Sequence, residues 1–87
     1  MLSQRKDILK VIKNQLETIT YLSFNLTENT NISFDLNISS TDLSNLISQL
    51  KDYYDIVKVY ENNEYYDYEN FITIGDIIDF IIQNIKE

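Results

Sequence analysis

Apolar residues near the N-terminus repeat with the spacing of an amphipathic helix. Between residues 4 and 20 they recur at intervals of three or four, at Ile8, Val11, Ile12, Leu16 and Ile19. Polar and charged residues fill most of the positions between them. Because this spacing places the apolar side chains on one face, the pattern predicts a helix over residues 4–20.

Residues 21–38 are rich in Asn, Thr and Ser and lack helical periodicity. Single apolar residues are spread through them, at Leu22, Phe24, Leu26, Ile32, Phe34, Leu36 and Ile38. Apolar side chains spaced through a polar connection can fix it to the core, so we expect a long ordered loop. The near alternation at residues 22, 24 and 26 also allows a short strand.

A second helix is predicted after residue 38. Ser39 and Asp42 have capping-box spacing, and Ile38 with Leu43 has the spacing of a hydrophobic staple. The stripe that follows ends near Asp55 and consists of Leu43, Leu46, Ile47, Leu50 and Tyr54.

The same signals predict a third helix that starts at Thr73 and ends about Lys86. Thr73 and Asp76 have capping-box spacing, and Ile72 with Ile77 has staple spacing. The apolar stripe is Ile77, Ile78, Ile81, Ile82 and Ile85. Gly75, the only glycine, lies in the first turn at a cost of about 1 kcal/mol relative to Ala, so we expect another segment to approach closely there.

Residues 56–71 allow two structures. A hairpin turning at Asn62-Asn63 is one, and a short helix over Glu64–Glu69 is the other. We favour a loop with the short helix, because a lone two-stranded hairpin is marginally stable. The prediction is an all-α fold: a small antiparallel four-helix bundle with three main helices and one short one. Its 87 residues form one domain (1–87), too small for a second core.

The composition removes most enzyme chemistry. The chain has no Cys and no His, so it lacks a thiol nucleophile, thiolate or imidazole metal ligands and the usual general base. The carboxylate pairs Asp52/Asp55 and Asp76/Asp79 are interpreted as solvated helix faces. We expect neither an enzyme nor a metal site.

Charge and hydropathy limit the classes of partner and the compartment that we expect. The net charge of −7 would repel a nucleic acid or an anionic membrane and favours basic protein surfaces. No apolar run reaches the ~20 residues of a membrane span, and the start lacks the apolar core of a signal peptide, so we expect a cytoplasmic protein. We also expect a monomer. Six of the seven Tyr lie between residues 53 and 68. We interpret them as half-buried packing, with a protein-binding patch as the second possibility.

Three segments together resemble the acyl carrier protein family over nearly the whole chain. The first is Phe34-Asp35-Leu36-Asn37, which precedes a helix that begins with Ser. The second is Tyr54-Asp55-Ile56, which closes that helix. The most specific is Ile72-Thr73-Ile74-Gly75-Asp76-Ile77-Ile78-Asp79-Phe80-Ile81, which is similar to the opening of the last helix of these carriers.

The resemblance implies a site and a function. In carriers the second helix begins with Asp-Ser-Leu, whose Ser bears 4′-phosphopantetheine. Counting back from Tyr54 assigns that role to Ser40, with Ser39 as the weaker candidate, and the motif here reads Ser39-Ser40-Thr41. The implied function is an acyl or aminoacyl carrier, as in fatty acid or polyketide biosynthesis. The implied partners are a phosphopantetheinyl transferase and acyl-processing or acyl-activating enzymes with basic patches, which we expect to contact Asp42, Asp52 and Asp55.

Other interpretations stay open. In an arbitrary helix Ser39 would simply be the cap and Ser40 a neutral first-turn residue. The chain could also be a carrier-like adaptor that binds proteins without the prosthetic group. A third possibility is a small acidic inhibitor or immunity-type protein that masks a basic toxin or enzyme surface.

Overall fold

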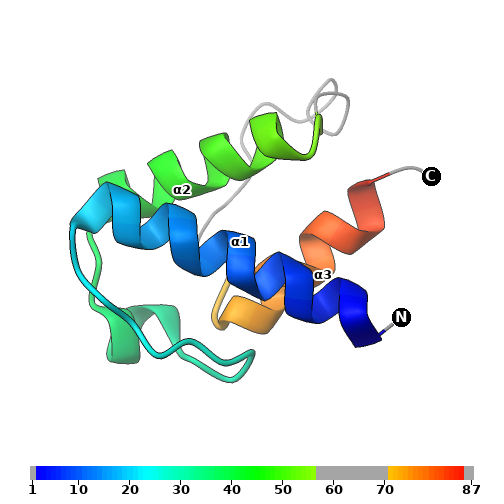
Figure 1. Ribbon diagram of the computed structural model, residues 1–87. Coiled ribbons are helices and arrows are strands. Elements are labelled where there is room, and N and C mark those ends of the chain that lie inside the picture. Colours follow the sequence, from blue (N-terminus) through cyan, green and yellow to red (C-terminus); the bar gives the residue numbers. More distant parts are fainter. Residues whose placement is uncertain (1, 57–70, 86–87) are drawn as a thin grey trace.

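The computed structural model describes residues 2–56 and 71–85. They form helix α1 (Leu2–Thr20), the short π-helix η1 (Ile32–Leu36), α2 (Ser40–Tyr53) and α3 (Ile74–Asn84), as Figure 1 shows. Among these residues there is no strand, only an isolated antiparallel bridge between Asn31 and Thr73. The described residues therefore agree with the all-α prediction, and the alternative strand at residues 22–26 is wrong. The predicted short helix over residues 64–69, and the rival hairpin, lie outside the described residues.

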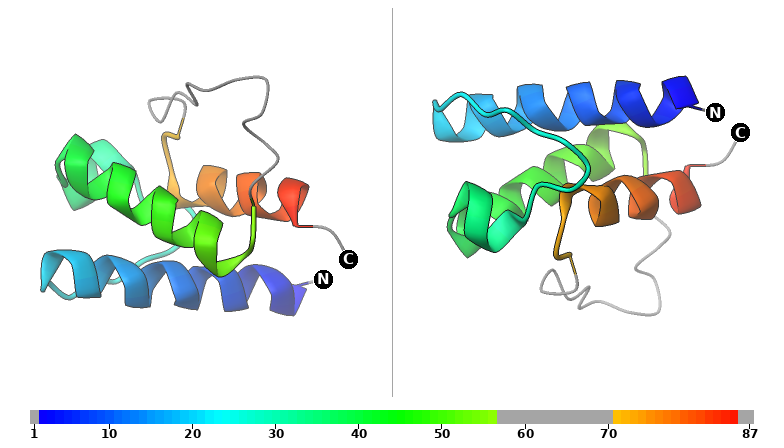
Figure 2. Two further views of the ribbon diagram at one scale, coloured as in Figure 1. Left: turned by 90° about the horizontal axis from the view of Figure 1, so that it is seen from above. Right: turned by 90° about the horizontal axis from the view of Figure 1, so that it is seen from below.

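Helix α1 packs against both of the other long helices. The views in Figures 1 and 2 agree that α2 and α3 run opposite to α1. The same views place the end of α1, η1 and the start of α2 at one end of the molecule, with η1 below the other two in Figure 1. We call this part of the molecule the Ser40 end, formed by residues 20–22, η1 and the first turn of α2.

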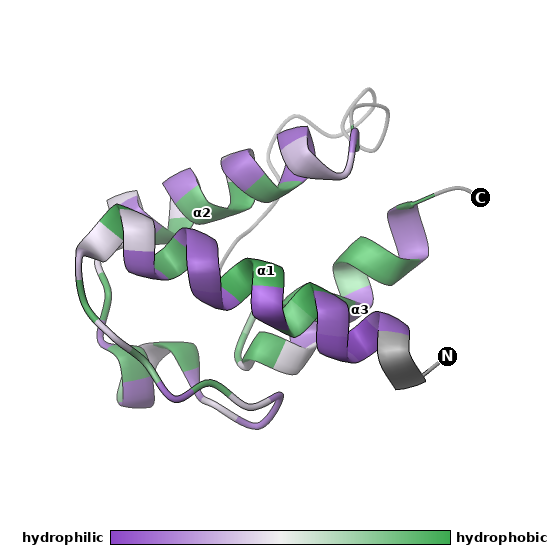
Figure 3. Ribbon diagram, viewed as in Figure 1, coloured by the Kyte–Doolittle hydropathy of each residue, from purple (hydrophilic) through white to green (hydrophobic). Residues whose placement is uncertain are grey.

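The core lies between the three long helices. Each helix supplies its predicted apolar stripe, and Figure 3 shows that most of α3 is hydrophobic, while α2 has a hydrophilic outer edge. The fully buried side chains among the described residues are Ile8, Ile12, Leu16, Leu46, Ile47, Leu50, Ile74, Ile77, Ile78 and Ile81. Burial of apolar surface on this scale is the main source of the fold's stability.

Two helices and η1 end on non-glycine residues with left-handed backbone conformation. These residues are Tyr21 (φ 62°), Asn37 (φ 52°) and Asp55 (φ 58°). After α2 the amide of Ile56 donates to the carbonyl of Lys51 at 2.8 Å, and the amide of Asp55 donates to that of Asp52 at 3.3 Å. This is the Schellman pattern, in which glycine is the usual residue at the position of Asp55. A side chain there costs about 1 kcal/mol.

The start of α3 confirms its predicted cap. Thr73 Oγ1 accepts from the Asp76 amide at 3.3 Å, and Asp76 Oδ2 accepts from the Thr73 amide at 3.1 Å. The helix ends at Asn84, two residues before the predicted end. The predicted staple is wrong, because Ile72 is 59% exposed. Its neighbour Phe71 is buried instead, at 6% exposure.

Residues 28–32 run antiparallel beside residues 72–75. The amide of Ile32 donates to Ile72 O at 2.9 Å, that of Ile74 to Thr30 O at 3.0 Å, and that of Gly75 to Glu28 O at 2.8 Å. A Cβ atom built on Gly75 would lie 3.0 Å from Glu28 O. The close approach predicted at the glycine is therefore confirmed.

The loop between α1 and α2 is fixed to the core by some of its apolar residues. Leu26, Ile32 and Leu36 are buried, and Phe24 and Ile38 pack against the core. The prediction is wrong for Leu22, which is 59% exposed, and for Phe34, which is 85% exposed. Since η1 makes one wide turn, Ile32 and Leu36 share its inner side and Phe34 lies on the outer side.

Candidate functional site

The first turn of α2 uses one of its two serines as a cap. Ser39 has extended backbone (φ −72°, ψ 161°), and its Oγ accepts from the amide of Asp42 at 3.0 Å. Its carbonyl accepts from the amide of Leu43 at 3.0 Å, which starts the helical ladder. The cap predicted at Ser39 is confirmed. Its hydroxyl is therefore engaged in holding the helix terminus.

Ser40 is the first residue of α2 and is exposed. Within residues 2–56 and 71–85 its hydroxyl makes no hydrogen bond. The first amides of a helix have no partner within the helix, and they form the positive end of its dipole. Ser40 thus offers a solvated hydroxyl beside backbone donors, which is an arrangement suited to bearing an anionic group.

The three predicted partner-contact carboxylates do not lie together. Asp42 is in the first turn of α2 with the two serines, whereas Asp52 is in the last turn and Asp55 follows the helix. At 1.5 Å per residue, Asp52 is about 18 Å along the helix axis from Ser40. The structure therefore brings Ser39, Ser40 and Asp42 together and places Asp52 and Asp55 at the opposite end of α2.

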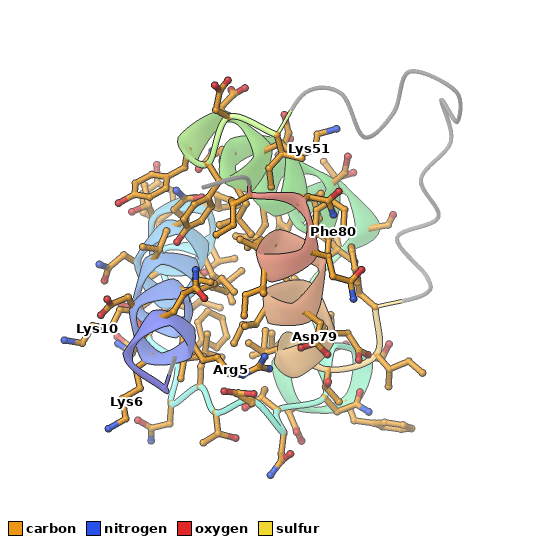
Figure 4. The ribbon with its side chains drawn as sticks, turned by 90° about the vertical axis from the view of Figure 1, so that its right-hand side faces the viewer. Arg5, Lys6, Lys10, Lys51, Asp79 and Phe80 are labelled. Carbon is orange, nitrogen blue, oxygen red and sulfur yellow. The ribbon has the colours of Figure 1, made fainter. Side chains whose placement is uncertain are left out.

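An ionic cluster that the sequence did not predict joins α1, the loop and α3. Arg5 Nη2 donates to Glu28 Oε1 at 2.6 Å, Arg5 Nε lies 3.0 Å from Glu28 Oε2, and Arg5 Nη1 donates to Asp79 Oδ1 at 2.9 Å. Figure 4 shows Arg5 reaching toward Asp79 on α3. The hydrogen bonds from Arg5 lower the pKa of Glu28, and those two carboxylates raise the pKa of Arg5.

These contacts change the interpretation of one carboxylate pair. Asp76 and Asp79 were interpreted as a solvated face of the third helix. Asp76 instead accepts from the amides of Ile72 and Thr73, and Asp79 binds Arg5. Asp76 therefore stabilises the start of α3, and Asp79 links this helix to α1. No three acidic side chains among the described residues gather closely enough to hold a metal ion.

A second ionic contact fixes the loop to the end of α1. Glu17 Oε2 accepts from Lys13 Nζ at 2.9 Å and from the amide of Phe24 at 2.9 Å. The hydrogen bond from Lys13 is the main cause of the lowered pKa of Glu17, and the Phe24 amide adds to it. Glu17 is thereby neutralised by a local partner.

The Ser40 end carries negative charge that no basic residue of the described part of the chain neutralises. The chain has no basic residue between Lys13 and Lys51, and four acidic ones: Glu17, Glu28, Asp35 and Asp42. Glu17 and Glu28 form ion pairs, whereas Asp35 and Asp42 have no basic partner among the residues that the structure describes. Lys6 and Lys10 lie in the first half of α1 and point away from the body of the molecule (Figure 4).

Comparison of the chain with protein-family models, with curated proteins and with solved structures found no match. None of the helices described has both the length and the apolar composition that a membrane span requires.

Proposed function

We propose that this chain is an acyl or aminoacyl carrier protein that bears 4′-phosphopantetheine on Ser40. We also propose that the protein folds as a carrier-like four-helix bundle and acts as a monomer in the cytoplasm. The observation that carries it is the position of Ser40: an exposed hydroxyl without an internal hydrogen bond, at the first residue of a 14-residue helix. The order of motifs that resembles the carrier family supports the same assignment.

The residues around Ser40 suit this role. Free amides in the first turn of α2, together with the helix dipole, would stabilise the negative charge of a phosphodiester. Because Ser39 already caps the helix, Ser40 can be esterified without loss of the capping hydrogen bond. The prosthetic group would supply the thiol that carries the acyl chain, so the chain itself needs no Cys and performs no catalysis.

Attachment would be the work of a phosphopantetheinyl transferase. Ser40 Oγ would form a bond to the phosphorus nearest the pantetheine of coenzyme A. The pyrophosphate bond would break, with 3′,5′-adenosine diphosphate as the leaving group, and the transferase would take the hydroxyl proton. Acyl-activating or acyl-processing enzymes, as in fatty acid or polyketide synthesis, would then use the arm.

Intact-mass measurement tests the proposal directly. The purified protein is incubated with coenzyme A and a broad-specificity phosphopantetheinyl transferase, and its mass is read before and after. We expect wild type and Ser39→Ala to gain one phosphopantetheine group, and Ser40→Ala to gain none. A gain that Ser39→Ala abolishes and Ser40→Ala retains would reassign the site to Ser39.

A double variant tests whether the neighbours of Ser40 limit the reaction. Ser39→Asp keeps an acceptor at the cap, and Thr41→Leu adds an apolar side chain; together they create the Asp-Ser-Leu motif of the family around Ser40. We expect this double variant to be modified faster than wild type. An equal rate would mean that residues 39 and 41 do not control recognition.

A protein-binding adaptor without the prosthetic group is the second candidate. It is favoured by the Ser39-Ser40-Thr41 sequence, which keeps only the hydroxyl residue of the motif, and by apolar side chains such as Phe34 in contact with water. The adaptor would be favoured if neither wild type nor the Ser39→Asp/Thr41→Leu double variant, called the motif-restored variant below, gained mass.

A further inference from the structure

Phe34 is held in solvent by a turn that is hydrogen-bonded on both sides of it. Its side chain is 85% exposed. Asn31 Oδ1 accepts from the Phe34 amide at 2.9 Å, and Asp35 Oδ2 accepts from the Asn31 amide at 2.8 Å. The left-handed Asn37 closes the turn, with its amide bonded to Ile32 O at 3.2 Å. The backbone on both sides of Phe34 is therefore fixed before any partner arrives.

The same turn is attached to the core and to the start of α3. Ile32 and Leu36 are buried on its inner side, and the amide of Ile32 donates to Ile72 O at 2.9 Å. An ordered backbone reduces the entropy lost on association, and aromatic side chains, Phe included, are enriched in the core of protein interfaces. Phe34 thus has the properties of a preformed binding anchor.

The anchor lies on the same end of the molecule as Ser40. Asn37 ends η1 and Ser40 begins α2, so few residues separate them along the chain. Tyr21 and Leu22, at the end of α1, add exposed apolar surface to the Ser40 end, at 90% and 59% exposure. Figures 1 and 2 show these three segments at one end of the molecule.

Charge indicates what kind of surface would cover this end. Asp35 and Asp42 lack basic partners among the described residues, and no Lys or Arg occurs from residue 14 to residue 50. The outer side of α2 is a poorer docking surface for a basic partner, since the helix carries no charged residue between Asp42 and Lys51. A complementary surface would be apolar opposite Phe34 and basic at its rim.

We propose that Phe34 is the anchor by which the transferase that modifies Ser40 docks on the protein. The partner would supply an apolar pocket for the phenyl ring and basic side chains facing Asp35 and Asp42. This inference rests on the carrier function proposed above. It differs from docking along the outer face of α2 because most of the affinity would come from an apolar contact, which salt screens little.

Steady-state kinetics of Ser40 modification by the same transferase test the inference. The test variant is Phe34→Ser, and the matched control is Tyr53→Ser, an aromatic residue 61% exposed near the opposite end of α2. We expect Phe34→Ser to lower kcat/KM about tenfold or more, mainly through a higher KM, and Tyr53→Ser to change it by less than about twofold. Phe34→Leu, which keeps an apolar side chain, should recover part of the loss.

Charge is tested in the same assay. Asp35→Asn keeps an acceptor oxygen for the Asn31 amide but removes the negative charge. We expect its loss of kcat/KM to shrink at high salt, whereas the loss in Phe34→Ser persists, because salt screens charges and not apolar contacts.

The outcomes separate the two proposals. Modification of wild type at Ser40 with an unchanged kcat/KM for Phe34→Ser would overturn the anchor and leave the carrier function standing. Absence of modification in wild type and in the motif-restored variant would overturn both. Circular dichroism and thermal unfolding verify that Phe34→Ser is folded. If it is not, the kcat/KM of Phe34→Leu is compared with that of Tyr53→Leu instead.

Discussion

The amide of Gly75 donates to the carbonyl oxygen of Glu28 at 2.8 Å, and a Cβ atom on Gly75 would lie 3.0 Å from the same oxygen. Glu28 cannot easily move away, because its carboxylate is bound to Arg5. In Gly75→Ala the gain in helix propensity, about 1 kcal/mol, should be outweighed by the crowding, which typically costs about 1–3 kcal/mol. We expect a net loss of about 1 kcal/mol in the free energy of unfolding, measured in urea.

Asn45→Ala is the matched control for this prediction. Asn45 is exposed in the interior of α2, so the substitution changes helix propensity without a steric conflict. We expect it to raise the free energy of unfolding by about 0.5 kcal/mol. If Gly75→Ala stabilised the protein as much as Asn45→Ala does, the loop would be free to shift away from α3.

Arg5 and Glu28 should be energetically coupled. Their contact uses two nitrogens of one guanidinium and links residues far apart in the chain, although both side chains are partly exposed. A double-mutant cycle with Arg5→Gln and Glu28→Gln should give a coupling energy of about 0.5–1 kcal/mol, reduced at high salt. A coupling energy of zero would show that the cluster adds nothing to stability.

The lowered pKa of Glu28 predicts how stability depends on pH. The folded protein binds fewer protons at this group than the unfolded chain does, so its stabilising contribution is present above the unfolded pKa and is lost as the pH falls through the folded pKa. Glu28→Gln should therefore lose stability near neutral pH and approach wild type as the pH falls from about 5 to about 3. Urea unfolding across this range measures the difference, and Arg5→Gln should diminish it.

The two serines at the start of α2 should respond differently to substitution. Ser39→Ala removes the acceptor for the Asp42 amide and should cost about 1 kcal/mol of unfolding free energy. Ser40→Ala removes no hydrogen bond within the described part of the chain and should change stability by less than about 0.5 kcal/mol. Thermal unfolding compares the two. A large loss of unfolding free energy in Ser40→Ala would show that the hydroxyl stabilises the fold, which contradicts this prediction.

The helices could be predicted from the sequence because their signals are local. The stripe from Leu43 to Tyr54 and the cap at Ser39 depend on residues within a few turns of one another, and the structure has them as expected. Gly75 was also informative, since a glycine inside a helix costs stability and so indicated a close neighbour. The identity of that neighbour, Glu28, could not be read from the pattern.

The remainder depends on contacts between distant segments. Arg5 is the only Arg in the chain, yet nothing in the spacing of Glu28 or Asp79 indicates that both would bind it. Phe34 was predicted to be buried because it is apolar. The turn around Asn31 and Asp35 overrides that preference, because it places Ile32 and Leu36 inward and leaves no inward position for the residue between them.

The left-handed residues that end the helical segments have a practical consequence. Tyr21, Asn37 and Asp55 each adopt a backbone conformation that glycine would occupy without steric cost. Engineering for heat resistance could therefore begin at these three surface turns. Every packed side chain of the interior would stay as it is.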